Sequence, residues 1–239
     1  MISLLPFGMT RLMRYAIYFA PCENSGLWQA GCRWLGRDAA SDTEMEQPGV
    51  PGMESATVRE LTTAPRRYGF HATLKAPFRL TGDASPGVFL ATVADFARRR
   101  KPFRIPRLKV ERLGSFLALQ IEESCEDLQL LASDCVREFD PFRAAESASD
   151  QARRAEGLGV RQRAHLETWG YPYVMDQWRF HMTLTNALGD SQLSILKGFL
   201  GDWFARVVVE PVWVRDLCVY VETAPGSNLT IAGRFPLSG

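Results

Sequence analysis

Apolar residues recur along this chain with two periods, one typical of strands and one typical of helices. Alternation indicates a strand, because successive strand side chains point to opposite faces, and a repeat of three or four indicates a helix. The pattern predicts strands over residues 14–20, 68–76, 103–108, 115–121, 179–186, 207–214, 216–222 and 229–235. It predicts helices over residues 28–35, 58–61, 85–101, 126–139, 161–169 and 193–204.

The predicted elements repeat within the chain. The strands at residues 68–76 and 179–186 are each followed by a helix and then by two strands. Strands that follow strands, with helices between the sets, favour antiparallel sheets and an α+β class. We expect residues 1–12 to be a loose leader and residues 13–239 a single domain, with a solvated connector at about 144–160.

Two short segments, residues 70–74 and 180–184, share the pattern Phe-His-x-Thr-Leu and contain two of the three histidines. In a strand, side chains two residues apart point to the same face. Each segment therefore directs one imidazole and one hydroxyl together, while its apolar residues point to a core. His165, the third histidine, lies in a polar predicted helix without a threonine partner, and we expect it at the surface or behind the residues that contact a substrate.

Counting by twos extends each of these two faces. The first face carries Arg67, Gly69, His71, Thr73 and Lys75, and the second carries Arg179, His181, Thr183 and Thr185. Neither face contains a carboxylate, which disfavours both a hydroxyl nucleophile relayed through Asp and His and a glycosidase. Two histidines also fall short of the three ligands of a metal site. The set suits a phosphoryl centre, at which one imidazole takes a proton and the other gives one.

Composition narrows the function classes further. The 239 residues carry 28 basic and 27 acidic side chains, so a protein that coats a polyanion is disfavoured, although a local phosphate pocket is not. The five cysteines show no metal-binding spacing, which favours reduced thiols in the cytoplasm. The sequence lacks a long apolar run, so we expect no membrane partner. We expect a monomer that needs no cofactor.

The paired motifs His71-Ala72-Thr73 and His181-Met182-Thr183 resemble the signature of the 2H phosphoesterase superfamily. The longer strings at residues 66–78 and at 169–173 with 179–185 are similar to a bacterial branch encoded near genes for phosphonate breakdown. The resemblance runs from about residue 13 to the C-terminus. The chain departs from that branch in its leader and in Asn186, where a glycine would be expected.

The resemblance implies a bilobed, pseudo-two-fold fold with two antiparallel sheets that form a central cleft, and with helices outside. It implies metal-independent hydrolysis of a small cyclic phosphodiester, with a ribose cyclic phosphate from phosphonate breakdown as one candidate. His71, Thr73, His181 and Thr183 would be catalytic. We expect substrate contacts from Lys75, Arg179, Arg67, Tyr18 and Tyr173.

Two alternatives remain at this stage. An enzyme that processes the 2′,3′-cyclic end of RNA would use the same motifs, although the near-neutral charge disfavours a long RNA partner. A nucleotide-binding module that has kept the cleft and lost turnover is the second alternative.

The Tyr171-Pro172-Tyr173 segment has two interpretations. It could form one side of the pocket for a sugar or base, or it could anchor the core.

Overall fold

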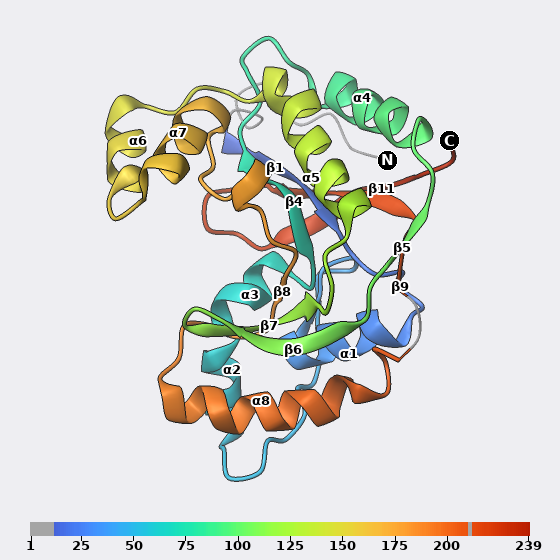
Figure 1. The fold of residues 1–239 in the computed structure, drawn as a ribbon, viewed down its shortest axis with the longest axis vertical. Coiled ribbons are helices and arrows are strands. Elements are labelled where there is room, and N and C mark those ends of the chain that lie inside the picture. Colours follow the sequence, from blue (N-terminus) through green and yellow to red (C-terminus); the bar gives the residue numbers. More distant parts are fainter. Residues whose placement is uncertain (1–11, 210–211) are drawn as a thin grey trace.

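The computed structural model describes residues 12–209 and 212–239, so residues 1–11 of the expected leader lie outside the described residues. Figure 1 shows an upper and a lower half joined near the middle of the molecule. The principal strands are β1 (Arg14–Phe19), β4 (Ala72–Phe78), β6 (Leu108–Leu113), β7 (Phe116–Ile121), β8 (Met182–Thr183), β10 (Asp216–Glu222) and β11 (Leu229–Pro236). They form one antiparallel sheet in the order β11-β10-β1-β4-β8-β7-β6.

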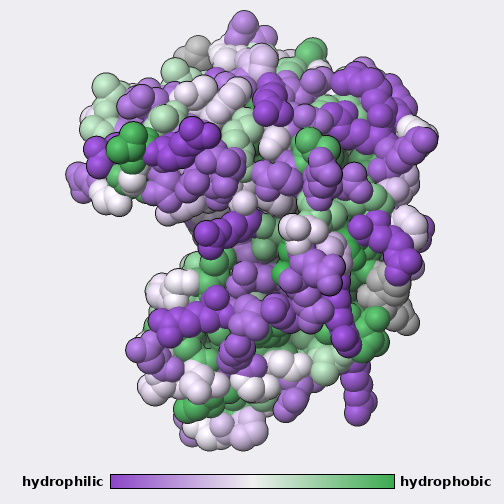
Figure 2. All heavy atoms as spheres, viewed as in Figure 1, coloured by the Kyte–Doolittle hydropathy of each residue, from purple (hydrophilic) through white to green (hydrophobic). Residues whose placement is uncertain are grey.

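The two halves of this sheet meet at one residue pair. Strand β4 pairs with β8 only at Ala72 and Met182. On their other sides, β4 pairs with β1 and β8 pairs with β7, each at more than one residue. The expected α+β class with antiparallel sheets and outer helices is therefore confirmed, and the two sheets are linked through this single pair. In the space-filling view the surface is hollowed between the halves (Figure 2).

Helices cover the outside of the sheet. They are α1 (Gly26–Leu35), α2 (Ser55–Leu61), α3 (Thr63–Tyr68), α4 (Pro86–Arg98), α5 (Glu126–Phe139), α6 (Ala148–Ala155), α7 (Val160–Trp169) and α8 (Asp190–Ala205). Helices α4 and α5 cover the upper half, and α8 lies along the lower one (Figure 1). Within the described ranges, every helix is too short or too polar to cross a membrane. Short strands complete the list: β2 (Arg37–Asp38), β3 (Thr43–Glu44), β5 (Phe103–Ile105) and β9 (Val212–Val214).

The expected internal repeat is present, and its two copies exchange their last two strands. Each copy runs strand, helix, short strand, long hairpin: β4-α4-β5-β6-β7 and β8-α8-β9-β10-β11. The hairpin β10–β11 joins the half that contains β4 and packs under α4, whereas β6–β7 joins β8 and packs on α8. The equivalent short strands β5 and β9 pair with each other. Neither half is therefore built from one copy alone.

Several predicted elements differ from the structure. Residues 63–68 are helical as α3, so the first motif strand begins at Ala72 rather than at about residue 68. Asn186, 122 residues away, caps this helix: its side-chain oxygen accepts a hydrogen bond from the Ala64 amide at 2.9 Å. The connector at 144–160 contains the exposed helix α6. Strand β9 covers only the last three residues of the strand expected at 207–214.

The second motif strand is shorter than the expected 179–186. The Leu184 amide still donates to the Leu117 carbonyl at 2.8 Å, but the Leu117 amide donates to the Thr185 hydroxyl at 3.0 Å, and the backbone leaves the ladder there. The Asn186 amide donates to the Leu61 carbonyl at 2.7 Å. The segment after β8 is thus tied to the junction of α2 and α3 instead of extending the sheet.

The apolar residues of both motifs lie in the core, as predicted. Phe70, Phe180 and Met182 are all buried, and burial of one such side chain stabilises the fold by roughly 1.5–3 kcal/mol. Phe70 lies so close to α1 that a Cβ on Gly31 would meet its ring at 2.2 Å. The core therefore fixes the backbone on which the motif histidines stand.

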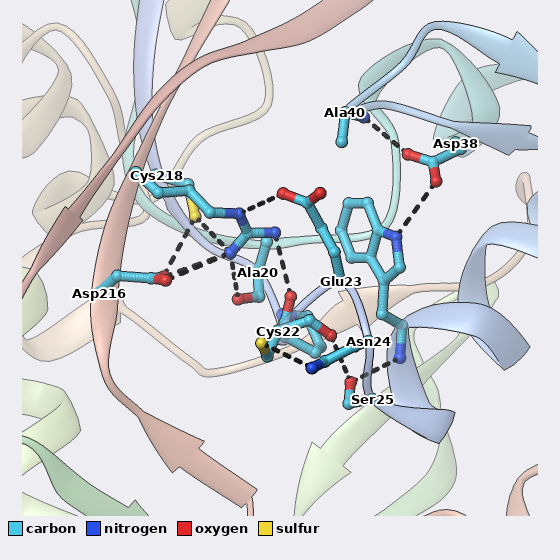
Figure 3. A network of polar contacts seen from close by, with 12 residues as sticks. Ala20, Cys22, Glu23, Asn24, Ser25, Asp38, Ala40, Asp216 and Cys218 are labelled. Carbon is cyan, nitrogen blue, oxygen red and sulfur yellow. Dashed lines mark hydrogen bonds and ion pairs between the residues drawn. The ribbon is translucent and has the colours of Figure 1, made fainter.

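A polar network secures the end of β1, where the chain turns into α1 (Figure 3). The guanidinium of Arg234 donates to the Pro21 carbonyl at 3.1 Å and pairs with Glu23 at 2.8 Å and Asp216 at 3.3 Å. Because this arginine lies on β11, the network joins β11 and β10 to the β1–α1 loop. Cys218 lies within it as a buried free thiol, and all five cysteines are unpaired.

Candidate active site

The four motif residues of the sequence prediction come together where β4 meets β8. Ala72 pairs with Met182 in antiparallel register, and these are the central residues of the two motifs. Their neighbours therefore lie opposite one another, His71 against Thr183 and Thr73 against His181. Since Ala72 and Met182 are buried, the imidazoles and hydroxyls share the other face. The arrangement has a pseudo-two-fold axis through the Ala72–Met182 pair.

In both histidines, a hydrogen bond from Nδ1 to a backbone carbonyl fixes the tautomer of the imidazole. The Nδ1 of His71 lies 2.9 Å from the Gly69 carbonyl oxygen, and the Nδ1 of His181 lies 2.9 Å from that of Arg179. A carbonyl oxygen can only accept, so each Nδ1 carries the proton in the neutral ring. Each Nε2 is then free to accept a proton from a bound group. The Nε2 of His71 lies 3.3 Å from the Thr73 hydroxyl.

Gly69 places the carbonyl that orients His71. It ends α3 with φ 78° and ψ 176°, a backbone conformation that is available essentially to glycine alone. A Cβ at this position would also lie 2.5 Å from the Cβ of Ala39. The local chain therefore needs glycine both for its conformation and for space.

The electrostatics of the site keep both imidazoles neutral in the free protein. Burial, together with a smaller effect of the His181 charge, lowers the pKa of His71 to about 4, although the hydrogen bond to the Gly69 carbonyl opposes this shift. Burial also lowers the pKa of His181. A bound phosphate would oppose both effects, because a neighbouring negative charge favours the protonated imidazole. Proton uptake by the pair is thereby coupled to anion binding.

Aromatic side chains support the two histidines. Tyr18 stacks on His71 with ring centroids 3.8 Å apart, and it is only 1% exposed, so the structure places it behind the imidazole. Tyr220 lies 6.0 Å from the same ring, and Phe116 lies 5.9 Å from His181. The Trp178 indole donates to the Thr73 carbonyl at 2.8 Å. Sequence reasoning missed all but Tyr18, because strand register decides which aromatic residues reach the site.

Lys75, the cation expected on the first motif face, lies on the opposite face of β4. Tyr18 pairs with Thr73 and Ile17 pairs with Lys75, so Leu74 is an extra residue and Lys75 lies on the opposite face from Thr73. Lys75 is 3% exposed, and its ammonium group donates to the Val136 carbonyl at 3.1 Å. Burial lowers its pKa to about 8, which its pairing with a carboxylate opposes. The structure does not bring Lys75 beside the histidines.

The other expected substrate contacts also lie apart from the four motif residues. Arg67 is in α3, pairs with Glu222, and donates to the Ser227 carbonyl at 3.0 Å. Arg179 is exposed and lines a separate cavity of about 460 Å³. Tyr173 is 47% exposed and packs edge-on against Tyr171 at 5.7 Å between ring centroids. Their contacts with a substrate stay predictions.

The expected surface position of His165 can be described more closely. Its Nε2 lies 2.8 Å from a carboxylate oxygen of Asp176, which also pairs with Arg161. This cluster is separate from the two motifs. In the part of the chain that the structure describes, no three His, Cys, Asp or Glu side chains gather as metal ligands.

Comparison with known proteins finds relatives that are about twice as long as this chain. It is 39% identical over 233 residues to the ribose 1,5-bisphosphate phosphokinase PhnN of Janthinobacterium sp. (strain Marseille), covering 95% of this chain and 51% of that protein. It is 34% identical over 215 residues to the protein of the same name from Laribacter hongkongensis (strain HLHK9), covering 90% and 50%. The chain thus spans about half the length of these curated relatives.

Solved structures similar to this chain include a phosphoesterase and E. coli LigT complexed with 3′-AMP. Their sequences are 13% and 12% identical to it, and each match has a TM-score of 0.40 and covers 95% of this chain and 99% of the other. A model of a family described as a protein of unknown function, DUF1045, matches residues 73–230, well over half of the chain. The chain therefore belongs to the DUF1045 family.

Proposed function

We propose that this protein is a phosphoesterase that hydrolyses a small cyclic phosphodiester with its two motif histidines. The observation that carries the proposal is the antiparallel register at Ala72 and Met182, which sets each histidine opposite the threonine of the other motif. Backbone carbonyls hold both Nδ1 protons and leave both Nε2 atoms unprotonated in the neutral rings. Two imidazoles and two hydroxyls suit a tetrahedral phosphate, because each group can form a hydrogen bond with one of its oxygens.

The proposed reaction needs one histidine in each protonation state. The neutral imidazole takes a proton from water as the water oxygen bonds to phosphorus. The protonated imidazole gives its proton to the ester oxygen as that phosphorus–oxygen bond breaks, and the product is a phosphomonoester with a free hydroxyl. Thr73 and Thr183 would hold the non-bridging oxygens through their hydroxyl groups. Because the arrangement is pseudo-two-fold, either histidine can act as the base or as the acid.

The names of the relatives support a sugar phosphate as substrate. A ribose 1,5-bisphosphate phosphokinase acts on phosphorylated ribose, and the chain matches about half of two proteins with that name. Hydrolysis of one ester bond of a ribose cyclic phosphate yields a ribose phosphate, the class of compound on which such a kinase acts. We therefore favour a ribose cyclic phosphate, and the resemblance of the motifs supports a role in phosphonate breakdown. Processing of RNA ends is the second candidate.

A substrate screen tests the proposal. The panel consists of ribose 1,2-cyclic phosphate, nucleoside 2′,3′-cyclic phosphates and an oligoribonucleotide with a 2′,3′-cyclic end, each with and without EDTA. We expect turnover of a small cyclic phosphate in the presence of EDTA. Faster turnover of the oligonucleotide would favour RNA processing, and binding without turnover would indicate a nucleotide-binding module. Loss of activity in EDTA with rescue by a divalent ion would contradict the metal-independent reaction.

The pH dependence gives a further expected result. The acid partner must be protonated, and burial lowers the pKa of both histidines from the ordinary 6.5. Above pH 6.5 the protonated form becomes scarce, so kcat/KM is expected to fall by about tenfold per pH unit. Below about pH 4 the His71 ring is charged as well, because its pKa is about 4, so it can no longer take a proton and kcat/KM falls again. A kcat/KM optimum above pH 7 would contradict this account.

A further inference from the structure

A second polar cavity lies along the edge of β4 that β8 leaves uncovered. It has a volume of about 530 Å³ and is bounded by the end of β4, by residues 143–147 and by the end of α7. Figure 1 shows α6 and α7 projecting beside this part of the sheet. The basic side chains that line the cavity are Arg14, Lys75, Arg79, Arg143, Arg153 and Arg154.

The cavity carries more positive than negative charge. Arg153 pairs with Asp150, Arg154 with Glu146, and Arg14 with a glutamate on β10. Lys75 and Arg143 share a single carboxylate, that of Asp140. Five of the six cations that line the wall are therefore paired, but with only four carboxylates, which leaves an excess of two positive charges. A concave wall with such an excess concentrates anions.

One of these cations is free to bind a ligand. Arg79 is exposed at the end of β4, and its guanidinium makes no hydrogen bond or ion pair within residues 12–209 and 212–239. Its charge reaches the cavity, since it lowers the pKa of Asp150, although by less than the nearer partners of that carboxylate. A planar guanidinium of this kind binds phosphate oxygens in a bidentate manner.

The cavity is adjacent to the motif histidines. The Tyr68 ring lies 6.2 Å from the His71 ring and also lines the cavity. Along β4, Thr73 lies at the active face and Ala76 at the near end of the cavity, roughly 10 Å apart at about 3.3 Å per residue, and Arg79 lines the cavity three residues further on. A phosphorylated pentose that extends from the histidines reaches the near end of the cavity, and binding of its terminal phosphate then needs the long Arg79 side chain to extend toward it. The two sites are therefore spaced for the two ends of one small molecule.

We propose that this cavity binds a second phosphate, carried by the same substrate molecule whose cyclic ester lies between His71 and His181. The inference rests on the proposed function and narrows it. The substrate class would be a pentose cyclic phosphate that bears a phosphomonoester at its other end. Arg79 and Arg153 would bind that terminal phosphate, because Arg79 is unpaired within the described residues and Arg153 shares an exposed ion pair that an anion can replace.

Matched substrate pairs test this proposal. Ribose 1,2-cyclic phosphate is compared with its 5-phosphate, and cytidine 2′,3′-cyclic phosphate with its 5′-phosphate. We expect the extra phosphate to raise kcat/KM at least tenfold, mainly through KM. Arg79→Gln and Arg153→Gln should each lower the ratio of the two kcat/KM values by about tenfold, the value of a hydrogen bond to a charged group. Equal kcat/KM values within both pairs would overturn the inference.

The control variant is Arg137→Gln. Arg137 pairs with Asp134 three residues before it, as Arg153 does with Asp150, but it lies on α5 outside the cavity lining. It should keep the wild-type ratio, and a comparable fall in this variant would overturn the assignment of Arg153. If inorganic phosphate alone changes turnover of the unphosphorylated substrates, and Arg79→Gln abolishes that effect, the cavity binds a free effector and the proposal is wrong. Failure to turn over any cyclic phosphate would instead contradict the proposed function.

Discussion

Replacement of either His71 or His181 by alanine is expected to lower kcat by a factor of about 10² to 10⁴. The reason is that the proposed reaction gives each imidazole one of the two proton transfers. Because the two rings act as one acid–base pair, the double variant should lose much less than the product of the two single losses. Single-turnover kinetics at the pH optimum would measure the chemical step directly.

Threonine variants provide the control for this experiment. Thr73→Val and Thr183→Val each remove one hydroxyl while they keep the shape of the side chain, so only one hydrogen bond to phosphate is lost. We expect each to cost less than the loss of a histidine, of the order of tenfold for a bond to a charged group. If turnover in either alanine variant of a histidine equals that of the wild type, the acid–base assignment is wrong.

The Gly69→Ala variant should be the most damaging single substitution outside the four motif residues. Its backbone conformation costs about 1–3 kcal/mol for any residue with a Cβ, and contact with Ala39 at 2.5 Å adds an overpacking cost of similar size. We expect the free energy of unfolding to fall by about 2–5 kcal/mol. Since the Gly69 carbonyl holds the His71 ring, kcat should also fall, by about 10² for a displacement near 1 Å.

Two further variants separate strain from steric overlap at this position. Adding Ala39→Gly to Gly69→Ala removes the overlap and should restore part of the stability, which chemical denaturation would measure. Gly114→Ala is the matched control, because Gly114 also has a positive φ, 61°, but no atom lies within 4 Å of the place that a Cβ would take there. A Gly69→Ala protein that is no less stable than Gly114→Ala would show that the contact with Ala39 is unimportant.

The sequence was sufficient to predict that the motif residues share one face, because the period of a strand is local. His71 and Thr73 needed only alternation, and the second copy of the motif indicated their partner. Lys75 does not share that face, because one extra residue, Leu74, reverses the alternation, and no local pattern marks a bulge. Arg67 is not on the strand, because residues 63–68 form α3, which is capped by the side chain of Asn186, 122 residues from Ala64.

The aromatic residues beside the two histidines could not be predicted from the sequence, for a different reason. Tyr220 and Phe116 reach the histidines only through strand order and register, which join segments from both halves of the chain. The cavity beside β4 likewise depends on where β8 stops pairing. Such features follow from tertiary packing rather than from any short segment.

The exchange of hairpins between the two copies has a consequence for how the protein is made. As the chain leaves the ribosome, β1 and β4 emerge long before β10 and β11. Arg14 can pair with Glu222 only after another 208 residues have been made. Contacts this distant in sequence make folding slow, and unpaired strand edges stay exposed in the meantime. The upper sheet can close only after synthesis has reached its second hairpin. The edge of β1 that pairs with β10 therefore stays open until residues 216–222 have been made.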